Sequence, residues 1–134
     1  MSEPAEFRHR VRVYWEDTDA GGVVYYANYL KFFERARTEW LRSLGISQEA
    51  GRVATGTVFV VADATVSYRR PARLDDEIVV TARVSDLCRA SLVFAQQAWR
   101  GEELLAEAEV RVGCVDAATF RPVRIPLPIF DALR

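Results

Sequence analysis

Histidine is scarce in this chain of 134 residues, in which His9 is the only one. Ser-His-Asp and Cys-His catalysis, and any metal site with several imidazole ligands, would have to use this one residue. His9 lies between Arg8 and Arg10 in a stretch that alternates like a strand, with no turn to expose a reactive group. The composition therefore disfavours these mechanisms.

Cysteine pairs, long apolar runs and an excess of one charge are also missing. Cys88 and Cys114 have no CxxC spacing, and the first residues lack the apolar core of a signal peptide, so we expect reduced thiols and a cytoplasmic protein. No apolar run approaches the roughly 18 residues that a membrane-spanning helix needs, so we expect a soluble chain. With 18 Lys and Arg against 19 Asp and Glu, the composition gives no reason to expect nucleic acid as a partner.

Alternation of apolar and polar residues is the dominant pattern that is present. It predicts β-strands, in which successive side chains point to opposite faces. In the second strand the pattern places Val58, Val60, Ala62, Ala64, Val66 and Tyr68 on one face. The segments with this pattern are 7–15, 57–69, 77–87, 91–99 and 103–115.

A helical period interrupts the strands once. Over 27–44 apolar residues recur at intervals of three and four, which predicts an amphipathic helix of about 18 residues. Gly45 follows the last apolar position, where helices commonly end in a left-handed residue. We expect one further short turn capped by Ser47 and ending at Gly51, and an extended proline-rich tail over 121–134.

One strand, one long helix and four strands predict an α+β domain, with a strongly bent antiparallel sheet packed on a central helix. A length of 134 residues and a hydrophobic fraction of 50% suffice for a single domain over 1–134 with its own core. One helix covers only one face of such a sheet. We therefore expect another copy to bury the second face or an edge, in a homo-oligomer.

The most unusual segment is 16–29, EDTDAGGVVYYANY, which places three carboxylates and two glycines before an aromatic entry into the helix. A carboxylate beside a helix amino terminus suits carbonyl chemistry. Free backbone N–H groups there stabilise a developing oxyanion while the acid acts on the reacting carbon or on water. The alternative is that the acidic residues only cap or solvate a turn.

Other chemistries fit this segment poorly. An EF-hand that starts at Asp17 would need an acid at Gly21 and a glutamate at Asn28. An Asp-x-Asp phosphotransferase with Asp17, Asp19 and magnesium would follow a strand that is apolar on both faces, whereas this strand carries arginine at alternate positions. There is no GxSxG elbow, P-loop or GxGxxG motif.

Aromatic and basic residues supply candidate binding groups. Tyr25, Tyr26, Tyr29, Phe32 and Phe33 either line a pocket or, as helical spacing more often means, belong to the core. Only Lys31 among the 18 basic residues is lysine. Guanidinium groups suit phosphates, and the arginines best placed to meet an anionic ligand are Arg69, Arg70, Arg73 and Arg89.

Several stretches together resemble a known family. They are VYWEDTDAGGVVYYANYLKFFERARTEWLRSLG, YRRPARLDDEIVV, ASLVFAQQAW and LLAEAEVRVGCVD. They resemble the YbgC-type, Tol-Pal-associated acyl-CoA thioesterases of the 4-hydroxybenzoyl-CoA thioesterase family, from about Phe7 to Pro126. The most specific match is the aspartate-x-x-glycine motif before the aromatic helix.

The resemblance implies a hotdog fold, with a curved five-stranded antiparallel sheet wrapped around one long central helix, in dimers or tetramers. It assigns the catalytic aspartate to Asp19, as nucleophile or general base, the motif glycine to Gly22 and the oxyanion N–H to Tyr26. Coenzyme A then leaves from an acyl-CoA substrate without any further cofactor, and its phosphates lie near surface arginines. We take Tyr25, Tyr29, Arg69, Arg70 and Arg89 as the substrate-binding candidates.

The chain departs from that pattern at one position. Many YbgC-type members carry histidine where this chain has Tyr26, which retains a backbone N–H but rules out a role for imidazole there. The missing histidine also disfavours hotdog dehydratases. We expect Glu16 and Asp17 to matter less for hydrolysis than Asp19. The competing hypothesis is a non-catalytic hotdog module that binds acyl carriers or cell-envelope partners.

Overall fold

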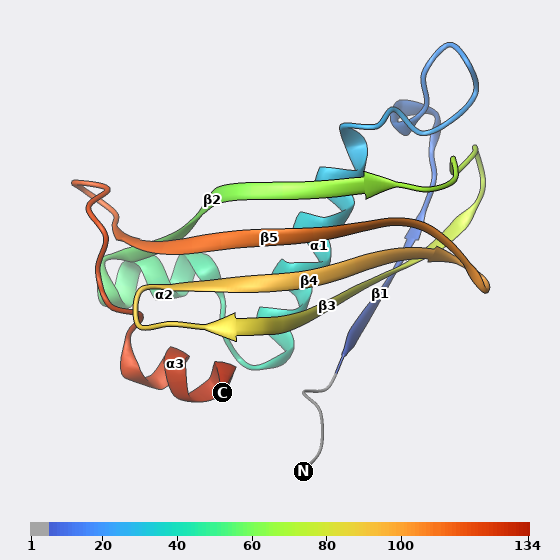
Figure 1. The fold of residues 1–134 in the computed structure, drawn as a ribbon. Helices are drawn as coiled ribbons and strands as arrows, with labels where there is room; N and C mark the ends of the chain where they lie inside the picture. The colour runs from blue at the N-terminus through green and yellow to red at the C-terminus, as the bar shows by residue number, and fades with distance from the viewer. Residues whose placement is uncertain (1–5) are drawn as a thin grey trace.

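The computed structural model describes residues 6–134. Residues 1–5, which belong to the chain start considered above for a signal peptide, lie outside this range. Five strands form one antiparallel sheet in the order β1-β3-β4-β5-β2. Three α-helices and a 3-10 turn accompany it (Figure 1). The elements are β1 (Phe7–Arg12), η1 (Trp15–Asp17), α1 (Asn28–Ser43), α2 (Gln48–Thr55), β2 (Thr57–Tyr68), β3 (Glu77–Leu87), β4 (Ser91–Arg100), β5 (Glu103–Asp116) and α3 (Leu127–Leu133).

Helix α1 is the centre of the core and lies against β1, β3 and β4. Phe32, Phe33 and Ala36 are fully buried on its sheet-facing side, as are Ile78 and Val80 on β3. Burial of such side chains contributes about 1.5–3 kcal/mol each. The predicted helix is confirmed to within one residue at each end, and Gly45 follows it with φ +83°.

Polar groups inside this core are paired. Gln96 on β4 is buried and donates through Nε2 to the carbonyl oxygens of Phe33 (3.0 Å) and Thr81 (3.2 Å). Its Oε1 accepts a hydrogen bond from Arg37 of α1 at 2.9 Å. Burial lowers the pKa of Arg37. The helix is thus held to the sheet by hydrogen bonds as well as by apolar contact.

The first strand is shorter than its alternation predicts. β1 ends at Arg12, and Trp15 lies in η1 with 79% of its surface exposed. The cause is Asp17, whose carboxylate accepts the backbone N–H of Tyr14 at 2.9 Å and turns the chain.

The second strand does not keep one face, and that prediction is wrong. Its pairing with β5 shifts between Val61 and Asp63. Before the shift Phe59 and Val61 pair with Cys114 and Val112, whereas after it Ala64, Val66 and Tyr68 pair with Val110, Ala108 and Ala106. These β5 residues are all buried. A bulge inserts one residue and so exchanges the faces of the alternation.

The remaining differences concern helices. α2 continues past the predicted Gly51 to Thr55 and ends at Gly56, which has φ +72°. The tail is not wholly extended, because α3 begins after Pro126 and buries Leu133. Proline is compatible with the first turn of a helix, where its missing N–H would have no partner in any case. No helix in residues 6–134 has the length and apolar character needed to cross a membrane.

Candidate active site

The segment after β1 folds into a tight hairpin that carries Asp19. Thr18 bridges to Val24, and the N–H of Asp19 donates to the carbonyl of Val23 at 2.9 Å. The turn closes through the N–H of Gly22, which donates to the carbonyl of Asp19 at 3.0 Å. Asp19 itself is exposed at the hairpin tip. This hairpin lies at one end of the sheet (Figure 1).

Two glycines shape the turn in different ways. Gly22 has φ +79°, in the left-handed region that side chains disfavour. Gly21 donates its N–H to Oδ1 of Asp19 at 2.8 Å, and a Cβ on Gly21 would lie 3.2 Å from that oxygen. The first glycine therefore lets the backbone approach the carboxylate, and the second lets the chain reverse. Within residues 6–134, Oδ2 of Asp19 accepts no hydrogen bond.

The entry to α1 orients one peptide group. The carbonyl of Tyr25 accepts the N–H of Asn28 at 2.8 Å. The N–H of Tyr26, which belongs to the same peptide group, points the opposite way because the peptide is planar and trans. It donates no hydrogen bond among the described residues. A free N–H at a helix amino terminus is suited to an oxygen atom that gains negative charge.

Asp17 anchors the base of the hairpin. It is only 3% exposed, and its carboxylate accepts Tyr14 N–H and the Lys31 ammonium, each at 2.9 Å. Its backbone carbonyl accepts the N–H of Tyr25 (2.9 Å) and Nδ2 of Asn28 (2.8 Å). Glu16, by contrast, is exposed. The sequence pattern gave no sign of this difference between the two acids.

The connection between β2 and β3 also supports the hairpin. Val24 N–H donates to the carbonyl of Ala72 at 2.8 Å, and Val23 bridges to Arg73. This loop is fixed by Asp76, which accepts Arg73 N–H at 2.8 Å and Arg100 at 2.7 Å. Burial favours the neutral acid at Asp76, but these two donors outweigh it and lower its pKa.

A pocket of about 240 Å³ opens beside the start of α1. Burial raises the pKa values of Tyr29 and Tyr68, so both hydroxyls stay protonated at neutral pH. Tyr68 donates to the carbonyl of Tyr26 at 2.9 Å, while Tyr29 accepts the N–H of Ala72 at 3.1 Å. The lining residues are Val24, Tyr26, Tyr29, Tyr68, Arg69, Arg70 and Pro71.

The other candidate residues differ in where the structure places them. Tyr25 is exposed and does not line the pocket, while Phe32 and Phe33 belong to the core. Arg69 and Arg70 reach the pocket and pair with the exposed Glu107 (2.7 Å) and Glu103 (3.7 Å).

Arg73 supports the hairpin through its backbone. Arg89 lies in the β3–β4 connection, at the opposite end of the sheet from the hairpin within one chain (Figure 1). Tyr68 was not among the site residues predicted from the sequence, because the alternating pattern of 57–69 predicts only that it lies on one face of a strand.

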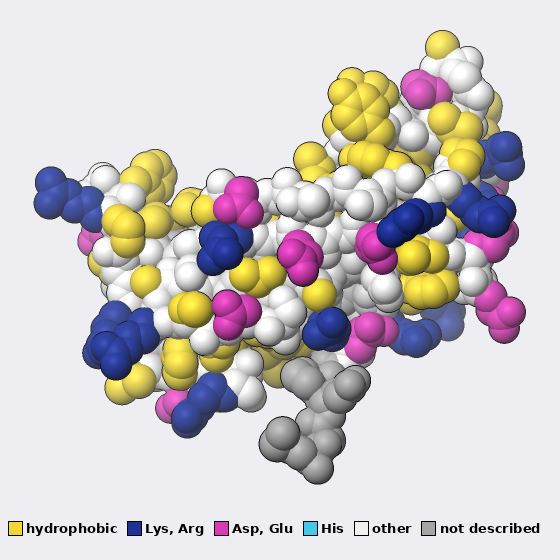
Figure 2. Space-filling view, viewed as in Figure 1, with side chains coloured by type: hydrophobic (Ala, Val, Ile, Leu, Met, Phe, Trp, Pro, Cys, Tyr) yellow, Lys and Arg dark blue, Asp and Glu magenta, His cyan; other side chains and the backbone are white. Residues whose placement is uncertain are grey.

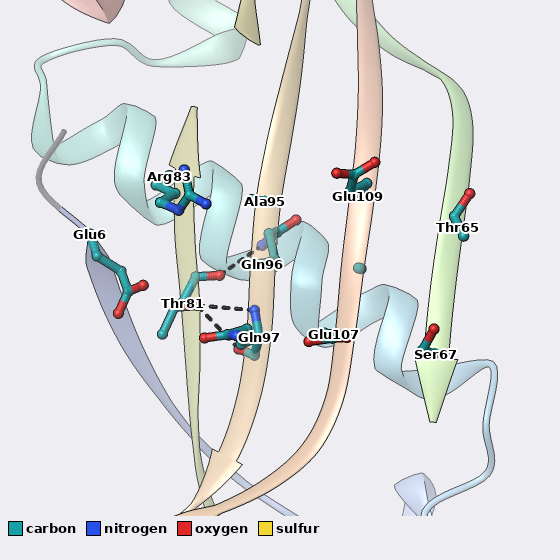
Figure 3. A pocket seen from close by; sticks show the side chains of 11 residues that line it. Glu6, Thr65, Ser67, Thr81, Arg83, Ala95, Gln96, Gln97, Glu107 and Glu109 are labelled. Carbon is teal, nitrogen blue, oxygen red and sulfur yellow. Dashed lines mark hydrogen bonds between the residues drawn. The ribbon is translucent and has the colours of Figure 1, made fainter. Parts of the chain in front are cut away.

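A second hollow of about 510 Å³ lies on the outer face of the sheet (Figure 3). One lining side chain bonds within the sheet: the backbone N–H of Gln97 donates to Oγ1 of Thr81 at 3.0 Å. Charges of both signs are interspersed over this face (Figure 2).

Within the described residues, no group of three or more His, Cys, Asp or Glu side chains is placed to hold a metal ion.

Comparison with known proteins shows the family to which this chain belongs. A family model described as the thioesterase-like superfamily matches residues 13–133. "Acyl-CoA thioester hydrolase YbgC" of Escherichia coli O157:H7 is 50% identical over 124 residues, which are 92% of each chain. The chain belongs to this family of YbgC-type thioesterases.

Two further relatives agree with this. "Acyl-CoA thioesterase YbgC" of Haemophilus influenzae is 46% identical over 90% of this chain and 88% of its own. The crystal structure of a probable thioesterase from Bartonella henselae has a TM-score of 0.85 and 35% identity, and the match covers 91% of this chain and 100% of that one. The sheet and central helix are the predicted hotdog fold, which is thereby confirmed.

The burial of Asp17 leads to a prediction about stability in this YbgC-type chain. Asp17→Ala leaves Tyr14 N–H and the Lys31 ammonium without their acceptor, so we expect a loss of about 2 kcal/mol in the free energy of unfolding. Glu16→Ala, the matched exposed acid, should change it by less than about 0.5 kcal/mol. Urea unfolding followed by circular dichroism measures both. Equal effects of the two substitutions would contradict the anchoring role.

Proposed function

We propose that the chain hydrolyses acyl-CoA thioesters, with Asp19 acting on the thioester carbon or on water and Tyr26 N–H binding the carbonyl oxygen. Two observations together carry the proposal: the carboxylate of Asp19 is exposed, and the oriented N–H of Tyr26 before α1 donates no hydrogen bond among the described residues. The names of the YbgC relatives support this reaction class. Overall, R–CO–S–CoA and water give R–COOH and CoA–SH.

The two roles of Asp19 share one geometry. As a nucleophile, a carboxylate oxygen bonds to the thioester carbon, the C–S bond breaks, CoA leaves as thiolate, and water hydrolyses the resulting anhydride. As a general base, the carboxylate takes a proton from the water that attacks. Either way negative charge develops on the carbonyl oxygen, where a preorganised N–H is most effective. Oδ2 of Asp19, which accepts no hydrogen bond from residues 6–134, is the atom suited to either role.

Tyrosine at position 26 is compatible with this scheme. The proposed donor is a backbone group, and its direction comes from the bond between the Tyr25 carbonyl and Asn28 N–H. The side chain of Tyr26 is 61% exposed and contributes to the pocket wall. A change of side chain at this position therefore leaves the donor in place.

The first prediction of this proposal concerns Asp19. Asp19→Asn keeps the size of the side chain and the acceptor for Gly21 N–H but removes the negative charge. We expect kcat to fall at least about 10³-fold, the scale seen when an essential catalytic group is removed. Thiol release from short-chain, long-chain and aromatic acyl-CoAs measures it.

A folded Asp19→Asn protein with undiminished turnover would overturn the role of Asp19. If the unaltered chain turns over none of these thioesters but binds an acyl carrier tightly, the chain is a binding module instead. Circular dichroism of each variant confirms that it is folded.

Arg69 and Arg70 are the proposed partners of the coenzyme A phosphates. Both lie at the pocket beside Tyr26, and their side chains are exposed. Exposed ion pairs contribute at most about 1 kcal/mol, so phosphate groups can compete with Glu107 and Glu103 for the guanidinium groups. The near-neutral net charge of −1 means that these local charges, rather than the whole field of the protein, attract the ligand.

Substitution of this arginine pair should affect binding more than chemistry. We expect Arg69→Ala with Arg70→Ala to raise KM about tenfold with kcat nearly unchanged, because phosphate contacts act equally in the ground and transition states. The effect should shrink as salt is added. Arg52→Ala on α2, an exposed arginine paired with Glu49, is the control. A KM that stays unchanged in the double variant would refute the assignment.

We also assign a homo-oligomer, dimer or tetramer, to this chain. The two sheet edges differ: β1 carries Arg8, Arg10 and Arg12, whereas β2 exposes Val60 (37%) and Val61 (53%). Charged residues protect a strand edge from pairing, and an apolar unprotected edge invites it. The β2 edge is therefore the surface where a second copy would extend the sheet.

Sedimentation velocity tests this assembly. We expect the unaltered chain to sediment as a dimer or larger and Val61→Lys to sediment as a monomer, because the substitution places a charge on the apolar edge. A monomeric unaltered chain would exclude the assembly. Acyl-carrier or envelope-associated partners and the cytoplasmic location stay predictions.

A further inference from the structure

Asn28, the first residue of α1, bonds to both halves of the proposed site. Its side-chain Nδ2 donates to the carbonyl of Asp17 at 2.8 Å, and its backbone N–H donates to the carbonyl of Tyr25 at 2.8 Å. The N–H of Tyr25 donates to the same Asp17 carbonyl at 2.9 Å. Three residues thus form a closed ring of hydrogen bonds between the end of the first strand and the start of the helix.

The ring connects the segments that carry Asp19 and the N–H of Tyr26. In the proposed function these two groups act on the carbon and the oxygen of one substrate carbonyl. The Asp17 carbonyl lies two residues before Asp19, at the base of the hairpin. The Tyr25 carbonyl belongs to the peptide group whose N–H is that of Tyr26. The side chain of Asn28 therefore holds the base of the hairpin that carries Asp19, and its main-chain N–H holds the peptide group that carries the Tyr26 donor.

We propose that Asn28 is a positioning residue, which sets the separation of Asp19 from the N–H of Tyr26. This inference rests on the proposed function, since both groups must reach the carbon and oxygen of the same carbonyl. Catalysis of this kind is sensitive to geometry, and a misplacement of about 1 Å costs on the order of 10²-fold in rate.

A purely structural role for Asn28 makes a different prediction. The side chain is partly buried at a helix start, and its loss would then lower stability without changing the rate of the folded protein. A positioning role instead lowers kcat in protein that is fully folded. It leaves KM nearly unchanged, because Arg69 and Arg70, the proposed phosphate partners, pair with Glu107 and Glu103 and not with residues of the ring.

The experiment compares Asn28→Ala with Gln48→Ala, at a temperature well below both unfolding midpoints. Gln48 of α2 donates one amide hydrogen bond to Thr38 of α1 at 3.2 Å, and it lies far from the hairpin along the chain. We expect Asn28→Ala to lower kcat by about 10- to 100-fold with KM within about threefold. Gln48→Ala should leave both constants unchanged.

A second readout uses the Asp19→Asn background. There the carboxylate is already absent, so adding Asn28→Ala should lower the residual rate by less than about threefold, as expected for residues that act as a unit. An undiminished kcat in Asn28→Ala, or an equal fall in both backgrounds, would overturn the positioning role. If Asn28→Ala fails to fold, Asn28→Asp keeps the shape and main-chain bond but loses the donor, and the same criteria apply to it.

The two proposals fail in distinguishable ways. An unaltered chain without turnover, or an active Asp19→Asn, refutes the proposed function itself. An active unaltered chain with an inactive Asp19→Asn and an unimpaired Asn28→Ala refutes only the role of Asn28.

Discussion

The carbonyl oxygen of Asp17 is the point on which the rest of the site depends. It accepts hydrogen bonds from Tyr25 and Asn28, while the carboxylate of the same residue accepts Tyr14 and Lys31. The end of β1, the hairpin and the first turn of α1 thus meet at one buried residue. Buried acceptors with several donors tolerate little displacement, because each unmade bond leaves a desolvated group. Asp17 stabilises the geometry and leaves Asp19 exposed at the hairpin tip.

The packing of α1 extends this constraint to the whole fold. Phe33 and Ala36 fix the helix against the sheet, and Gln96 ties its backbone to β3 and β4. The start of the helix is consequently a rigid place for a peptide donor. The same packing lies on the β1 side of the sheet, and β2, which α2 contacts, forms the other edge. The proposed second copy would lie against this β2 edge.

Sequence patterns predicted most of the fold because they report on faces buried by regular structure. The helix over α1, the five strand segments along the chain and the special turn at Asp19 all followed from period and turn chemistry. The bulge at Ala62 did not, since an inserted residue leaves local alternation intact while exchanging its faces. The helix α3 replaces part of the predicted extended tail, because proline is compatible with the first turn of a helix. Tyr68 and Asn28 were missed as site residues because their partners, Tyr26 and Asp17, lie 42 and 11 residues away.

A chain with one histidine can perform carbonyl chemistry with a carboxylate and a backbone N–H in place of an imidazole. A carboxylate supplies the negative charge that either role of Asp19 requires, and a peptide N–H supplies a hydrogen-bond donor. The rate then depends on the distance and direction between the two groups. This explains why the hydrogen bonds around Asp19 and Tyr26 come mainly from backbone atoms, whose positions survive changes of side chain. The side chains of Asn28 and Tyr68, which donate to the carbonyls of Asp17 and Tyr26, lie just outside the proposed reacting centre.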